Sequence, residues 1–166
     1  LAPSADALGL ADDKIKAVRY FSNSGDAQGR RGQPMVNQST NVVIIETEGG
    51  LSGIGEGGEP TSMDECASML VGQDPFRTDQ HWQRMLRGYF YPAGREKLHS
   101  LGALDVALWD LKAKALDVPL WQLLGGKSRE HLELYATAFP RGPNGTLEDA
   151  ARACMDAGFR CYRHAT

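Results

Sequence analysis

Residues 24–39 hold a dense group of side chains that can donate hydrogen bonds to a carboxylate or to hydroxyl groups. The donors are Arg30, Arg31, Gln33, Asn37 and Gln38. Several glycines and a proline interrupt the segment, so we expect a long irregular loop, and such loops in compact domains are usually functional or disordered. On residue types alone, two interpretations stay open: a substrate-binding loop that uses Arg30 and Asn37, or a solvated loop without a role.

Residues 53–58, Gly-Ile-Gly-Glu-Gly-Gly, satisfy the G-x-G-x-x-G pattern of dinucleotide-binding loops. That pattern binds a pyrophosphate where it joins the first strand of a parallel sheet to a helix. Here it follows a predicted antiparallel hairpin, and Pro60 delays the next helix. The acidic residue expected at the end of a second strand is also absent. We therefore interpret these glycines as residues of tight turns.

Asp105, Asp110 and Lys112 are among the charged residues that interrupt the otherwise apolar stretch at residues 103–126. Helical spacing places Asp105 and Lys112 on one narrow strip and Asp110 on the opposite side. A catalytic carboxylate is one interpretation. An unpaired buried charge is costly, however, so a structural ion pair or a cap on a neighbouring loop is favoured.

Composition and charge exclude several classes of function. With 166 residues and a formal net charge of −3, nothing favours nucleic acid or an anionic membrane as a partner. No run reaches the roughly 18 apolar residues of a membrane span, and residues 1–13 lack the basic start of a signal peptide and predict a flexible leader. The three cysteines suit a reducing compartment, which predicts a cytoplasmic protein. His81, His99 and His131 each lack a second metal ligand four residues further along the chain, so we expect them to be surface or packing residues and not metal ligands.

Three strands are predicted in the first third of the chain. Residues 14–23 read as a strand, and residues 41–48 are a β-branched run. Gly49-Gly50 is a strong hairpin turn into a third strand at residues 51–55. Together they predict an antiparallel meander.

Two helices are predicted next. The spacing Ser62-x-x-Glu65 is a capping box that opens a helix through about residue 71. Asp74-Pro75 predicts a second helix through about residue 88, with proline at its first position. Meander and helices together indicate an α+β domain.

A long helix at residues 101–116 carries two apolar stripes and is followed by a short helix at residues 120–124 and a Gly-Gly stop. The first stripe is Leu101, Leu104, Leu108, Leu111 and Ala115, and the second is Val106, Trp109, Ala113 and Leu116. A helix with two apolar faces is expected between two layers, since each buried Leu or Val is worth roughly 1.5–3 kcal/mol.

After Gly126 the pattern changes to strand, helix, strand, at residues 131–138, 146–157 and 159–165. This is the pattern of a βαβ unit with parallel strands. Parallel sheets are covered on both faces, so one such unit is expected to be part of a larger sheet.

The stretch ALDVALWDLKAKALDVPLWQLLGG at residues 103–126 resembles the signature of the enolase superfamily, in the mandelate racemase and muconate lactonizing enzyme group. Supporting landmarks are Lys14-Ile15-Lys16, residues 49–56 and Gly158-Phe159-Arg160. The resemblance implies an N-terminal capping domain at residues 14–126 and the incomplete start of a TIM-like (β/α) barrel at residues 127–166.

The resemblance also implies a reaction that begins with removal of the proton α to a carboxylate, with Mg²⁺ stabilising the enediolate. The family places its metal ligands on the third, fourth and fifth barrel strands. We therefore expect Mg²⁺ as cofactor, no metal ligand within this chain, and ligands beyond Thr166.

In the family, residues 24–39 and 56–59 correspond to two lid segments over the barrel mouth. Substrate contacts are then expected from four residues, Arg30, Asn37, Tyr135 and Thr137. A hydroxylated substrate suits this polar lid.

Racemase-like members carry a Lys-x-Lys pair on the second barrel strand, where this chain has Arg163 and Ala165. Strand alternation directs Arg163 into the site and His164 toward the helices. Arginine stays protonated and is a poor base, so Arg163 is expected to bind a carboxylate or hydroxyl or to stabilise negative charge. His164 is a catalytic candidate only if the strand register shifts by one residue.

Loss of both lysines favours a sugar-acid dehydratase, a lyase, over a racemase, epimerase or cycloisomerase of the same superfamily. A hypothesis of a different class is a non-catalytic fragment without activity of its own. The expected partners are a small hydroxy-carboxylate substrate and further copies of the chain in a homo-oligomer, without nucleic acid or membrane.

Overall fold

The computed structural model describes residues 12–21, 41–88, 90–137 and 145–163. The chain divides into two compact units, Leu1–Gly126 and Lys127–Thr166. Outside the described residues lie Arg30, Asn37 and His164, and residues 1–11 of the leader predicted over residues 1–13.

The first unit is built on a three-stranded antiparallel sheet in the order β1 (Ile15–Phe21), β2 (Val42–Thr47), β3 (Ser52–Glu56). The β2–β3 hairpin turns at Gly50, whose φ of +87° is the left-handed conformation that glycine adopts freely. The predicted meander is confirmed. Each end of each observed strand lies within one or two residues of the predicted end.

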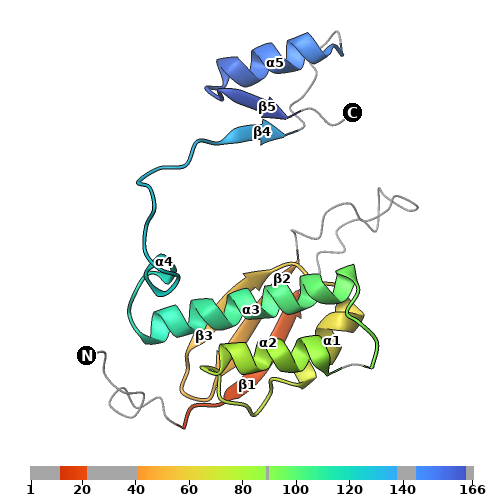
Figure 1. Cartoon of the computed structure of the whole chain (residues 1–166), viewed down its shortest axis with the longest axis vertical. Helices are drawn as coiled ribbons and strands as arrows, with labels where there is room; N and C mark the ends of the chain where they lie inside the picture. Colours follow the sequence, from red (N-terminus) through yellow and green to blue (C-terminus); the bar gives the residue numbers. More distant parts are fainter. Residues whose placement is uncertain (1–11, 22–40, 89, 138–144, 164–166) are drawn as a thin grey trace. The chain divides into compact units, whose positions relative to one another are not determined.

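Four helices belong to this unit: α1 (Pro60–Ser68), α2 (Thr78–Arg87), α3 (Arg95–Ala115) and α4 (Leu120–Leu123). Figure 1 shows α3 running across the sheet with α1 and α2 beside it. In the described ranges, no helix is long and apolar enough to cross a membrane.

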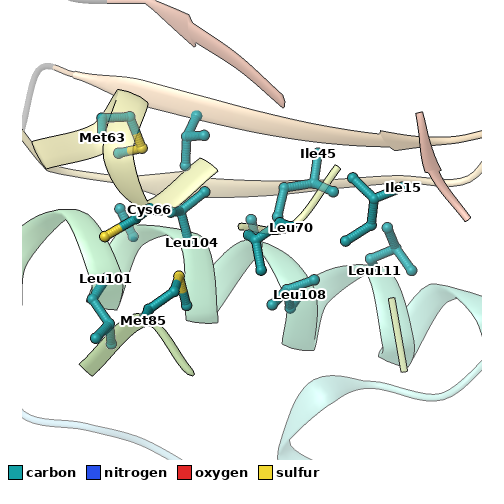
Figure 2. Close-up of a cluster of buried hydrophobic side chains, with 13 residues drawn as sticks. Ile15, Ile45, Met63, Cys66, Leu70, Met85, Leu101, Leu104, Leu108 and Leu111 are labelled. Carbon is teal, nitrogen blue, oxygen red and sulfur yellow. The ribbon is translucent and has the colours of Figure 1, made fainter. Parts of the chain in front are cut away.

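The core lies between α3, the sheet and the two shorter helices (Figure 2). The predicted first stripe of α3 is buried at Leu101, Leu104, Leu108 and Leu111. Ile15, Val43 and Ile45 meet it from the sheet, and Met63, Cys66, Leu70 and Met85 fill the space from the side of α1 and α2. Side chains of this size each contribute roughly 1.5–3 kcal/mol on full burial.

Two glycines of β3 let α3 approach the sheet at backbone distance. A Cβ placed on Gly53 would collide with the carbonyl oxygen of Ala107, and one on Gly55 with that of Ala103. Neither obstacle is the tip of a flexible side chain. The interpretation of these two glycines as turn residues is therefore wrong, because they lie within a strand and serve close helix packing. Gly57 and Gly58, with φ of +113° and +93°, do turn the chain after β3.

Side chains of α3 also complete the outer edge of β3. Asp110 Oδ2 accepts a hydrogen bond from the Ile54 amide at 2.9 Å, and Lys114 Nζ donates to the Ser52 carbonyl at 3.1 Å. Asp110 and Lys114 are themselves paired at 2.7 Å. The favoured structural interpretation of Asp110 is confirmed, since its carboxylate satisfies a strand edge that would otherwise be open to pairing.

Three predicted helix starts differ from the observed ones. α1 begins at Pro60, because the Glu59 side chain and not Ser62 provides the N-cap. α2 begins at Thr78, because Asp74 Oδ1 accepts the Phe76 amide and holds residues 74–77 in a turn. α3 begins at Arg95, six residues before the predicted start.

The second predicted stripe of α3 has a mixed environment. Ala113 is buried, Trp109 and Leu116 are half-buried, and Val106 is 50% exposed. Lys112 Nζ lies 5.1 Å from the centre of the Trp109 ring, a cation–π distance. The helix ends at Ala115 with Leu116 as its C-cap, and Asp117 follows with a left-handed φ of 52°.

The second unit contains β4 (Tyr135–Thr137), α5 (Leu147–Asp156) and β5 (Cys161–Arg163). The two strands pair in parallel, as predicted for a βαβ unit. Both strands begin later than predicted, β4 at Tyr135 and not at residue 131, and β5 at Cys161 and not at residue 159. Thr146 caps α5 by accepting the Asp149 amide, and Gly158 ends the segment with a φ of +90°.

The backbone contact between β3 and α3 predicts a large effect of a single methyl group. Gly55→Ala is expected to lower the free energy of unfolding by about 3 kcal/mol, because the strand and helix must separate to admit the Cβ. The measurement is urea unfolding followed by far-UV circular dichroism.

Gly102→Ala is the matched control, since a Cβ there meets nothing within 4 Å. An alanine within a helix, with open space for its Cβ, is expected to raise stability by about 0.5–1 kcal/mol relative to glycine. Equal effects of the two substitutions would contradict the packing role of Gly55.

Candidate functional site

Both segments expected to act as lids leave the sheet of the first unit at the same end. Phe21 at the end of β1 pairs with Val42 at the start of β2, and Val42 pairs with Glu56 at the end of β3. Residues 22–40 therefore start and finish beside the strand end from which residues 57–59 emerge. This adjacency is a property of the register and does not depend on the course of residues 22–40.

The segment from Gly57 to Glu59 is held by side chains from β1, from the residue before β2 and from α3. The Tyr20 hydroxyl donates to the Gly58 carbonyl at 2.8 Å, and the Asn41 side-chain amide donates to the same oxygen at 2.9 Å. The Glu59 amide donates to Ser100 Oγ of α3 at 3.0 Å. Asn41 and Ser100 are buried at 1% and 0% exposure, so the segment is fixed from its inner side.

Burial raises the pKa of Tyr20 above its ordinary value, and the nearby Glu59 charge acts in the same direction. The phenol therefore stays protonated at neutral pH and acts as a hydrogen-bond donor. Its role toward Gly58 is structural positioning, because the proton is already committed to a backbone carbonyl.

Glu59 serves as the N-cap of α1. Its carboxylate accepts the amides of Ser62 and Thr61, both at 2.9 Å. These two backbone hydrogen bonds lower the pKa of Glu59, since they favour the charged form. A carboxylate engaged in this way is a structural anchor for the segment and not a proton carrier.

The second unit presents three of the predicted site residues on one side of its strand pair. In the register Thr137 is paired with Arg163, and Tyr135 is paired with Cys161. All four are exposed, whereas the intervening Ala136 is buried and Tyr162 is half-buried. The strands thus place Tyr135, Thr137 and Arg163 together on the face that α5 does not cover.

The described residues do not gather metal-ligating side chains into one group. Among these, no group of three or more His, Cys, Asp or Glu side chains lies close enough to hold a metal ion. His81, which the sequence favoured as a surface or packing residue, is buried, and its Nε2 lies 2.7 Å from the Asp74 carbonyl. The described residues therefore do not form a magnesium site.

Sequence reasoning missed the residues that hold Gly57–Glu59. Ser100 had a detectable signal, because it stands four residues before Leu104 and eight before Leu108, and so interrupts a buried apolar stripe with a hydroxyl. Asn41 and Tyr20 had none, since a polar residue at the start of a strand and an aromatic residue within one are both ordinary.

A three-stranded meander covered by helices, followed by a βαβ unit, is the architecture expected of a capping domain and the start of a barrel. The chain belongs to the mandelate racemase / muconate lactonizing enzyme family, whose N-terminal domain model matches residues 31–125.

Two similar curated proteins have names that refer to sugar-acid dehydratases. A D-galactonate dehydratase family member from Cellvibrio japonicus is 39% identical over 130 residues, covering 74% of this chain and 32% of that protein. A D-mannonate dehydratase from Rhizorhabdus wittichii is 36% identical over 133 residues, covering 75% of this chain and 33% of that protein. The chain thus spans about a third of the length of these relatives.

Solved structures agree with this family. An enolase from Pantoea ananatis with bound D-gluconate and magnesium matches with a TM-score of 0.69 at 28% identity, over 91% of this chain and 36% of that one. A member of the enolase superfamily from Salmonella Typhimurium matches with a TM-score of 0.70 at 26% identity, over 90% of this chain and 41% of that one.

The Glu59 cap predicts a pH-dependent contribution to stability. Because the folded-state pKa lies below the ordinary value of 4.5, the contribution is present above that pH and is lost as the pH falls through the folded-state pKa. Glu59→Gln is expected to be less stable than wild type by about 0.5–1 kcal/mol at pH 7, with the deficit shrinking on acidification. Urea unfolding between pH 7 and pH 3 measures it.

Asp64→Asn is the control, because it removes a charge from an exposed position of α1 away from the cap. We expect a change within about 0.5 kcal/mol. A Glu59→Gln deficit that stays constant down to pH 3 would contradict the capping account.

Proposed function

We propose that this chain is the N-terminal part of a magnesium-dependent sugar-acid dehydratase. The reaction removes the proton α to a carboxylate and then eliminates water from a hydroxylated acid. The observation that carries the proposal is the identity of 39% and 36%, over about three quarters of the chain, to relatives named for galactonate and mannonate dehydration.

The position of Arg163 supports the dehydratase over a two-base racemase. Family members that racemise place lysines at the positions of Arg163 and Ala165, and a guanidinium remains protonated at neutral pH. Arg163 is exposed on the uncovered face of the β4–β5 pair, beside Thr137. We assign it the binding of the substrate carboxylate or a hydroxyl, where its charge also opposes the negative charge that develops on proton removal.

We propose the remaining substrate contacts from their position beside Arg163 or beside the expected lid segments. Tyr135 and Thr137 supply hydroxyl groups on the face that carries Arg163. Arg30 and Asn37 belong to the segment that leaves the sheet beside Gly57–Glu59, where a lid would start. His164 stays a secondary catalytic candidate, since the exposure of Arg163 supports the register that directs Arg163 and not its neighbour into the site.

The magnesium ion is assigned to a part of the parent protein outside the described residues, which do not form a metal site. Its function there is to stabilise the enediolate charge. For the same reason we propose that the 166-residue chain is inactive alone. Cytoplasmic location and assembly into a homo-oligomer remain predictions.

Metal dependence tests the proposed reaction. A parent polypeptide that continues this chain through a complete barrel is expected to convert a member of a galactonate, mannonate and gluconate panel to its 2-keto-3-deoxy acid with Mg²⁺. Excess EDTA should reduce the rate to background, and added Mg²⁺ should restore it. Formation of the keto product is followed with semicarbazide.

The 166-residue chain serves as the negative control in that assay. Full activity after complete metal removal would contradict the mechanism. Epimerised acid without loss of water would replace the dehydratase by the racemase or epimerase alternative.

Substitution of Arg163 tests its assignment in the same parent polypeptide. Arg163→Gln is expected to raise the KM for the sugar acid roughly ten- to hundred-fold, because a charge-assisted hydrogen bond to the carboxylate is lost. Arg152→Gln, on the exposed face of α5, removes an equal charge and should leave KM unchanged. An unchanged KM in Arg163→Gln would remove Arg163 from the substrate site.

A further inference from the structure

A pocket of about 300 Å³ opens between α2 and α3 of the first unit. It is lined by Asp79 and Trp82 of α2 and by Asp105 and Trp109 of α3. Asp79 and Trp82 stand three residues apart and Asp105 and Trp109 four apart, so each pair lies on one face of its helix. Two carboxylates and two indoles therefore meet in one concavity, in a region that the proposed active site does not use.

Neither carboxylate has a counter-ion in the part of the chain that the structure describes. Among the residues that the structure describes, no Lys, Arg or His side chain forms an ion pair with Asp79 or Asp105. Asp105 is half-buried, and this burial raises its pKa above the ordinary value. A partly desolvated carboxylate without a counter-ion is a cost to the fold that a bound cation would offset.

A lysine of α3 contacts one of the two indoles that line the pocket. Lys112 Nζ lies over the Trp109 ring at 5.1 Å, so the indole already takes part in a cation–π contact. Among the described residues, Lys112 forms no ion pair with Asp105, and burial is the one cause of the raised Asp105 pKa, with no opposing effect of a nearby cation. The described residues therefore supply no cation that pairs with either carboxylate of the pocket.

We propose that the α2–α3 pocket binds a guanidinium or alkylammonium group, with the carboxylates of Asp79 and Asp105 facing its charge and the indoles of Trp82 and Trp109 facing its planar or apolar part. Aromatic rings and carboxylates together are the groups that recognise organic cations in proteins. The volume is at the lower end of small-molecule sites and accommodates a single arginine-sized side chain or a free amine.

The cation has two possible sources, an arginine side chain of a polypeptide or a free small amine. Val106, 50% exposed, stands three residues before Trp109 and extends the apolar surface past the pocket. Apolar residues that flank a bound arginine would contact this extension, whereas a free amine would not. Affinity for a flanked and an unflanked arginine therefore distinguishes the sources.

Tryptophan fluorescence of the 166-residue chain tests the site directly. The chain has three tryptophans, so a Trp121→Phe background leaves only the two that line the pocket. Titration with N-acetyl-argininamide is expected to give a saturable change, and the neutral isostere N-acetyl-citrullinamide is expected to give none. Added NaCl should weaken the response, since exposed charges are screened.

Asp105→Asn removes the charge with little change in shape and is expected to weaken binding about tenfold. It should unfold at the same or a higher temperature than wild type, an outcome that a merely structural carboxylate would not give. Asp64→Asn on α1 is the matched control and should bind as wild type does.

The peptide acetyl-Leu-Arg-Leu-amide completes the design. Several-fold tighter binding of the peptide supports the site and identifies a polypeptide side chain as its ligand, and equal affinity supports the site with a free amine. No saturable response to either probe, an equal response to the citrulline analogue, or unchanged affinity in Asp105→Asn would overturn the proposal. No readout depends on the proposed dehydratase activity.

Discussion

The contact between the backbone of α3 and strand β3 is the constraint on which the first unit depends. Gly53 and Gly55 present no side chain to the helix, and the carbonyl groups of Ala107 and Ala103 occupy the space that a Cβ would need. At this separation the leucine stripe of α3 reaches the sheet and fills the core. The same approach brings Asp110 and Lys114 within hydrogen-bonding distance of the outer edge of β3.

The position of α3 also fixes part of the candidate site. Ser100, one turn before Leu104 on α3, holds the Glu59 amide, while Tyr20 and Asn41 hold the Gly58 carbonyl from the sheet. The segment after β3 is therefore a rigid part of the domain, at the strand end where residues 22–40 also begin and finish. The capping domain thus supplies fixed attachment points for the proposed lids, and the second unit supplies the face with Tyr135, Thr137 and Arg163.

Prediction from the sequence succeeded where a local pattern has a single low-energy solution. The β-branched run before Gly49-Gly50 and the leucine spacing of α3 gave the strands, the hairpin and the buried stripe. The predicted helix starts were wrong where two local hydrogen-bonding arrangements compete. Ser62 is the usual kind of N-cap residue, yet the Glu59 carboxylate accepts the Thr61 and Ser62 amides and caps α1 instead. Asp74 suits either a cap or a turn, and its hydrogen bond from the Phe76 amide makes a turn.

By itself the sequence determined the periodicities, and through them the α+β meander, the βαβ unit and the family. Only the tertiary structure decided the roles of individual residues within those elements. Gly53 and Gly55 read as turn glycines until α3 lies against them, and Asp110 and Asp105 look alike in sequence although one completes a strand edge and the other lines a pocket. The physical reason is range: hydrophobic spacing acts within one element, whereas each of these roles depends on atoms from another element, such as the Ile54 amide that Asp110 accepts from across 56 positions of the chain.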